Sequence, residues 1–136
     1  MDWGLIEQKL ESLGRAVKRG VEHCPDDPVT LAHDYDAQDI VSLNLTRAVQ
    51  ICVDIANHIL SEKDVPAPVS MGQSFDLLQQ QGIIEDRLCT RMKKAVGFRN
   101  LAVHNYDAID WAIVHAIVKR DASDFKEFAE AVLRLR

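Results

Sequence analysis

Residues 30–61 read TLAHDYDAQDIVSLNLTRAVQICVDIANHILS and form the longest helical pattern in the sequence. Its apolar residues recur at helical spacing over many turns. On an ideal helix they cover a broad sector, made of Val41, Leu45, Ala48, Cys52, Ile55, Ala56 and Ile59. A helix that is apolar over so wide a sector is normally central, covered on two sides by neighbours or by a second subunit. We therefore expect one long central helix.

The rest of the chain predicts further helices around it. Apolar residues return at helical spacing over residues 5–22 and 85–104, and Ser74 is placed to cap a short helix that ends near Gly82. Asp110 can open a fifth helix, and the helical pattern continues to Leu133. No segment alternates with period two over a useful length. The sequence predicts an all-α bundle of about five helices, with residues 1–136 forming a single domain.

Composition narrows the function classes. The chain has 136 residues, 47% of them hydrophobic, and a net charge of −5, which argues against a globally cationic nucleic-acid binder but leaves room for a local basic site. The three cysteines are scattered and form no CxxC pair, and no metal, Walker or G-x-S-x-G motif is present. We expect neither a metal nor a cofactor. With no apolar run of about 18 residues, we expect a cytoplasmic protein.

Arg99 occupies an unexpected place in the helix predicted over residues 85–104. The apolar stripe of that helix runs through Leu88, Met92 and Ala95, and an ideal wheel puts Arg99 within about 20° of its centre. A buried guanidinium needs a partner, because an unpaired one costs several kcal/mol. Arg99 is therefore either half of a structural ion pair, with Asp54 as a candidate, or a group that faces an anion-binding cleft.

Asn100 and His104 are separated by four residues, so they are neighbours on one helix face. An asparagine there can fix the tautomer of the imidazole for proton transfer. The alternative is a histidine that merely caps the helix C-terminus. Arg99 and His104 lie about 140° apart on an ideal helix, so they converge only if the helix distorts before His104 or if two chains meet.

Two further groups of charged residues are candidates. The segment with no acidic residue between Leu88 and Tyr106 is a candidate docking site for a phosphate backbone or simply a solvated face, and its cations are Arg87, Arg91, Lys93, Lys94 and Arg99. On the long helix, three polar side chains fall within about 40° of one another. They form either an ionic network or a site wall, and they are Arg47, Asp54 and His58.

Residues 97–106, GFRNLAVHNY, resemble the R-x4-H-x-Y signature of HepT-like toxins, which belong to the HEPN superfamily of all-helical ribonucleases. The resemblance extends to residues 47–60, 74–78 and 124–128, and covers about residues 30–133. It implies a metal-independent endoribonuclease that dimerises so that two motifs face each other across a cleft. Arg99 would hold the scissile phosphate, His104 would act as general acid or base, and Asn100 would orient it.

The resemblance also implies a partner and a means of control. In a type VII-like toxin–antitoxin pair, a minimal nucleotidyltransferase antitoxin would transfer AMP to Tyr106, and the added charge and bulk would block RNA. Transfer RNA is the substrate that the family suggests. Three alternatives remain from the residues: Tyr106 as a core tyrosine, an inactive helical module that binds nucleic acid or a partner protein, and a purely structural bundle.

Overall fold

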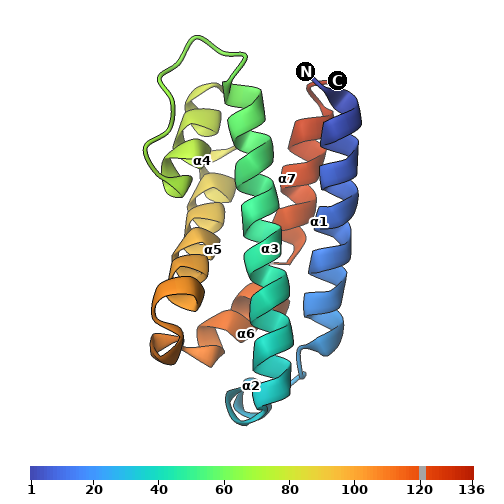
Figure 1. Ribbon diagram of the computed structural model, residues 1–136, viewed down its shortest axis with the longest axis vertical. Coiled ribbons are helices and arrows are strands. Elements are labelled where there is room, and N and C mark those ends of the chain that lie inside the picture. The colour runs from blue at the N-terminus through green and yellow to red at the C-terminus, as the bar shows by residue number, and fades with distance from the viewer. Residues whose placement is uncertain (120–121) are drawn as a thin grey trace.

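The computed structural model describes residues 1–119 and 122–136, and all regular structure in them is helical (Figure 1). The α-helices are α1 (Trp3–His23), α2 (Pro28–His33), α3 (Tyr35–Leu60), α4 (Met71–Gln80), α5 (Asp86–His104), α6 (Trp111–Lys119) and α7 (Ser123–Leu133), and a short 3-10 helix, η1, covers Tyr106–Ala108. The predicted all-α fold is confirmed. None of the helices in the described residues is long and apolar enough to cross a membrane.

The long helix α3 is central, as its apolar sector predicts. It lies between α1 and α5, with α7 behind (Figure 1). Val41, Ala48, Cys52 and Ile55 on α3 are fully buried, because neighbouring helices cover it from several sides. The core continues into the contact between α4 and α7, where the rings of Phe75 and Phe128 meet edge to face with centroids 5.9 Å apart.

The described residues hold seven α-helices, more than the expected number of about five. The stretch before the central helix is a separate short helix, because Asp34 ends α2 and its Oδ1 accepts the Ala37 N–H at 3.1 Å, capping α3. The chain after Asp110 likewise forms two helices, α6 and α7, where the sequence pattern predicted a single continuing segment.

The start of α4 also differs from expectation. Ser70, not Ser74, caps this helix, since its Oγ accepts the Gln73 N–H at 3.1 Å. Ser74 lies inside the helix, is 1% exposed, and donates a 2.7 Å hydrogen bond to Asn57 Oδ1 on α3. Gly82, with φ of +75°, takes the left-handed conformation that ends the turn after α4.

Candidate active site

Helix α5 carries the apolar stripe that the sequence predicted, and Arg99 interrupts it. Leu88, Met92 and Ala95 are buried, whereas Arg99 is half-buried. The Nε atom of Arg99 is buried and has no hydrogen-bond partner among the described residues, while Nη1 donates to Asn100 Oδ1 at 3.3 Å. A buried donor left without a partner costs about 1–3 kcal/mol. The position therefore holds a cation at a cost in stability.

A structural ion pair does not explain Arg99. In the part of the chain that the structure describes, no carboxylate lies within 4.0 Å of its guanidinium. The suggested pairing with Asp54 is wrong, because Asp54 lies 3.5 Å from Lys9 Nζ on α1 and accepts a 2.9 Å hydrogen bond from Gln50. Of the two interpretations drawn from the sequence, an open guanidinium that faces an anion is the one that fits.

His104 is the last residue of α5, and its side chain is exposed. The helix breaks only after it, at Asn105, where φ is −154° and ψ is +68°. Because α5 stays helical through His104, Arg99 and His104 lie on different sides of it, about 140° apart. The imidazole makes no hydrogen bond to any described residue, and Asn100 contacts Arg99 instead. A single chain thus presents the two motif residues in different directions.

Tyr106, in η1, is held against α3. Its hydroxyl donates a 2.9 Å hydrogen bond to Asp39 Oδ1 and accepts a 3.5 Å hydrogen bond from the Ser42 hydroxyl. Its ring meets Trp111 edge to face at 5.7 Å. Burial raises the pKa of Tyr106 and the Asp39 carboxylate raises it further, while the Ser42 hydroxyl lowers it. Tyr106 is thus a protonated hydrogen-bond donor at neutral pH.

Asp39 and Ser42 are site residues that sequence reasoning missed. They lie three positions apart on α3, more than sixty residues from Tyr106 along the chain. Nothing in the α3 sequence marks them, since polar residues occur throughout the N-terminal half of that helix. Only the antiparallel packing of α5 against α3 brings the tyrosine to them.

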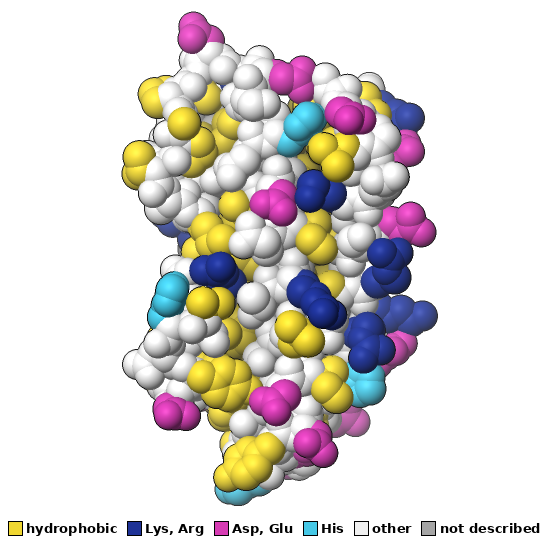
Figure 2. Space-filling model, viewed as in Figure 1, with side chains coloured by type: hydrophobic (Ala, Val, Ile, Leu, Met, Phe, Trp, Pro, Cys, Tyr) yellow, Lys and Arg dark blue, Asp and Glu magenta, His cyan; other side chains and the backbone are white. Residues whose placement is uncertain are grey.

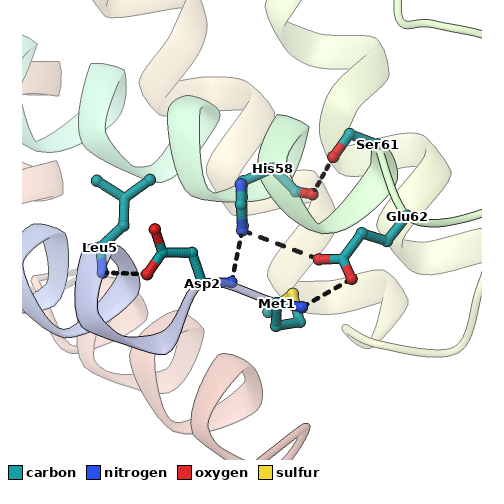
Figure 3. Close-up of polar contacts among 6 residues, drawn as sticks. All are labelled: Met1, Asp2, Leu5, His58, Ser61 and Glu62. Carbon is teal, nitrogen blue, oxygen red and sulfur yellow. Dashed lines mark hydrogen bonds and ion pairs between the residues drawn. The ribbon is translucent and has the colours of Figure 1, made fainter.

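His58 packs against the N-terminus, not against the motif helix (Figure 3). Its Nε2 accepts the Asp2 backbone N–H at 3.2 Å and lies 3.9 Å from Glu62. The terminal amine of Met1 binds Glu62 at 2.7 Å, and this hydrogen bond lowers the pKa of Glu62. His58 thus helps to fix the start of α1 on the end of α3.

The three charged residues predicted to share a face of α3 therefore separate by role. Asp54 and His58 contact α1 and the residues just before it, whereas Arg47 is exposed and lines a groove between α1 and α3. No contact in the described residues joins any of them to Arg99 or His104.

The basic segment of α5 is largely neutralised. Three of its cations each contact a carboxylate of α4 or α7: Arg87 with Glu127 at 2.8 Å, Arg91 with Asp124 at 3.1 Å, and Lys93 with Asp76 at 3.0 Å. The absence of acidic neighbours in sequence did not predict this, because the partners come from other helices. The segment is less suited to a phosphate backbone than we expected.

A metal site does not stand out in the described residues. They contain no group of three or more histidine, cysteine, aspartate or glutamate side chains placed to hold an ion. The three cysteines are free and buried.

Comparison with known proteins assigns the chain to a family. The family model described as Ribonuclease HepT-like matches residues 6–132. The chain belongs to this family. Its relatives include the mRNA nuclease HepT of Shewanella oneidensis, 36% identical over 94% of this chain and 96% of the relative, and the tRNA nuclease HepT of Aphanizomenon flos-aquae, 29% identical over 78% and 72%.

Solved structures agree with this assignment. The tri-AMPylated HEPN toxin of Shewanella oneidensis, in complex with an MNT antitoxin, superposes with a TM-score of 0.86 at 36% identity, covering 96% of this chain and 97% of that one. The HepT-like resemblance read from residues 97–106 is thereby confirmed, and so is the predicted class of activity, a HEPN ribonuclease.

Proposed function

We propose that this chain is the ribonuclease toxin of a toxin–antitoxin pair, with Arg99 and His104 as its catalytic residues. The observation that carries the proposal is the half-buried guanidinium of Arg99, which has a buried Nε without a partner and no carboxylate nearby among the described residues. An enzyme keeps such a cation where negative charge develops in the transition state. The named nuclease relatives support RNA as the substrate, and transfer RNA is the first one to test.

The chemistry needs only groups of the motif. The 2′-oxygen of the RNA attacks the adjacent phosphorus and gives up its proton, while the bond to the 5′-oxygen breaks and that oxygen takes a proton. His104 transfers one of these protons, and Arg99 stabilises the charge on the phosphoryl oxygens. Asn100, bonded to Arg99 at 3.3 Å, orients the guanidinium in the single chain.

A homodimer completes the site. Arg99 and His104 diverge by about 140° around α5, so one phosphate contacts both only if a second chain supplies one of them. Two motifs facing each other across a symmetric interface satisfy this requirement. We assign no part in the cleavage chemistry to Arg47, Asp54 and His58, whose contacts lie toward α1 and the residues just before it. We place this enzyme in the cytoplasm, with its RNA.

Tyr106 is the proposed point of control. The toxin in the Shewanella complex is tri-AMPylated and bound to an MNT antitoxin, and we assign the same kind of partner to this chain. The Tyr106 oxygen attacks the α-phosphorus of ATP and pyrophosphate leaves. The phenolic proton passes to Asp39, whose Oδ1 already accepts the 2.9 Å hydrogen bond of the tyrosine hydroxyl. The new phosphodiester has no proton to donate, so Asp39 repels it and the tyrosine leaves α3 toward the RNA site.

The decisive test is RNA cleavage by purified protein whose intact mass shows no AMP, with EDTA present and transfer RNA and bulk RNA as substrates. We expect cleavage by the wild type and a loss of about 100-fold or more in His104→Ala. His23→Ala is the matched control, since His23 is also exposed in the last turn of a helix, α1. A wild type that binds RNA without cutting it would overturn the proposal in favour of a binding module.

Modification is tested separately by incubation with the antitoxin and ATP. We expect Tyr106→Phe to gain no AMP, while Tyr35→Phe, which removes a tyrosine that is 76% exposed, is modified like the wild type. Addition of AMP to Tyr106→Phe would refute the assignment.

A further inference from the structure

The polar contacts between α1 and α3 differ between the two ends of the seam where these helices meet. Near the N-terminus of α1, polar contacts join the two helices: the Met1 amine binds Glu62 at 2.7 Å and the Asp2 N–H binds His58 at 3.2 Å (Figure 3). Further along α1, Lys9 forms an ion pair with Asp54 at 3.5 Å. From Ser12 onward, the described residues form no ion pair between α1 and α3. The seam opens there into a groove of about 370 Å³, and none of the described residues that line it is acidic.

Three arginines line this groove. Arg15 and Arg19 lie one turn apart on α1, and Arg47 faces them from α3, with the amide side chains of Asn44 and Gln50 beside it. Arg15 lies 3.8 Å from Glu11, an exposed pair of small energetic value. Arg19 and Arg47 form no ion pair with any described residue. Figure 2 shows the resulting cluster of Lys and Arg side chains over α1 and the adjoining part of α3.

The packing of α1 against α3 brings the arginines together. Ala16, next to Arg15, is buried in this contact, and an added Cβ on Gly20 would lie at an ordinary van der Waals distance, 3.8 Å, from Asn44 Cβ. Guanidinium groups therefore lie on both sides of one seam. They repel one another, and among the described residues Glu11, 3.8 Å from Arg15, is the one carboxylate within ion-pair distance of these arginines. In a protein of net charge −5, such a group is a local exception that suits an anion.

The groove lies across α3 from the proposed active site. The hydrogen bond between Tyr106 and Asp39 shows which part of α3 lies beside the C-terminal end of α5. Five residues of α5, from Arg99 to His104, span about 7.5 Å at 1.5 Å per residue, and Tyr106 follows two residues later, so Arg99 lies roughly level with residues 44–49 of α3 because the two helices run antiparallel (Figure 1). Arg47 is in that stretch. One helix diameter, roughly 10–12 Å, therefore separates the groove from Arg99.

We propose that Arg15, Arg19 and Arg47 bind the phosphate backbone of the RNA substrate as it crosses α3 toward Arg99. The inference rests on the proposed ribonuclease function. Guanidinium forks match phosphate oxygens in a bidentate manner. The described lining residues include no aromatic side chain on which a base could stack, so the contact is to the backbone and independent of sequence. This site adds affinity and register, and leaves the chemistry to the motif.

The test measures binding apart from cleavage. A His104→Ala background keeps the RNA intact, and fluorescence anisotropy follows labelled transfer RNA as salt is raised. We expect Arg19→Gln with Arg47→Gln to weaken binding about tenfold, and to lower the slope of log affinity against log salt by roughly 1.4, which is 0.7 for each of two phosphate contacts. The charge-matched control replaces Lys63 and Arg134, exposed cations outside the groove, with glutamine.

Each outcome decides the proposal. Equal affinities and salt slopes for the groove variant and its control would overturn it, even if the wild type cleaves RNA. Loss of antitoxin binding with RNA binding unchanged would also overturn it, since the groove would then serve an acidic protein. If the wild type cleaves no RNA but the groove variant still binds RNA more weakly, the groove stands and the proposed function fails. Thermal unfolding verifies folding, and removal of mutually repelling charges leaves stability equal or higher.

Discussion

Replacement of Arg99 by leucine separates function from stability in one variant. The substitution removes the buried Nε that has no partner among the described residues, and continues the apolar stripe of Leu88, Met92 and Ala95. An unsatisfied buried donor costs about 1–3 kcal/mol. Since Arg99 is only half-buried, we expect the lower end of that range, a gain of about 1 kcal/mol and a rise in Tm of about 4 °C. Cleavage should fall by about 100-fold.

Arg91 on the same helix supplies the matched control. Its guanidinium contacts Asp124 at 3.1 Å, and that carboxylate is 5% exposed. Arg91→Leu removes a cation from beside a buried charge, so it should destabilise the fold by about 1–3 kcal/mol. Urea and thermal unfolding of both variants and the wild type, at one protomer concentration because the protein is proposed to dimerise, give the comparison.

The reasoning on Arg99 is refuted if Arg99→Leu loses as much stability as Arg91→Leu. That result would mean that Arg99 contributes to the fold in the way a structural ion pair does. Unchanged cleavage in a folded Arg99→Leu protein would refute its catalytic role instead.

Three further outcomes follow from buried groups. Because the pKa of Tyr106 is raised in the folded state, its contribution to stability is fully present below the unfolded-state pKa of about 10 and is lost as pH rises through the folded-state pKa. Urea unfolding across that pH range should show a smaller decline in the free energy of unfolding for Tyr106→Phe than for the wild type. Burial raises the pKa of the Cys52 thiol, and burial together with a hydrogen bond to Asp76 raises the pKa of Cys89 to about 11. A thiol reagent at neutral pH should therefore label neither cysteine until denaturant is added. Rapid labelling of the native protein would contradict their burial. Ser74→Ala should cost about 0.5–1.5 kcal/mol in urea unfolding, because it removes the 2.7 Å bond to Asn57; no loss would show that this bond adds nothing net.

Local patterns in the sequence were enough for much of the fold. The spacing of apolar residues gave the all-α class, the central place of α3 and the apolar stripe of α5, because the helical period follows from backbone geometry within a few residues. The same periodicity exposed Arg99 as a cation on an apolar stripe. The motif from Arg99 to Tyr106 is contiguous, so the family was also recognisable without a structure.

Tertiary structure decided which groups are partners. The sequence suggested Asp54 as a partner of Arg99, but in the folded chain Asp54 pairs with Lys9. The carboxylates that neutralise cations of α5 come from α4 and α7. Asp39 becomes the partner of Tyr106, and Arg47 joins two arginines of α1, only because the packing of α3 against its neighbours fixes which faces meet. Hydrogen bonds and ion pairs act over a few ångströms, whereas these residues lie tens of positions apart in the chain. Helical periodicity fixes the face on which each side chain lies, and the packing of the helices fixes what that face meets.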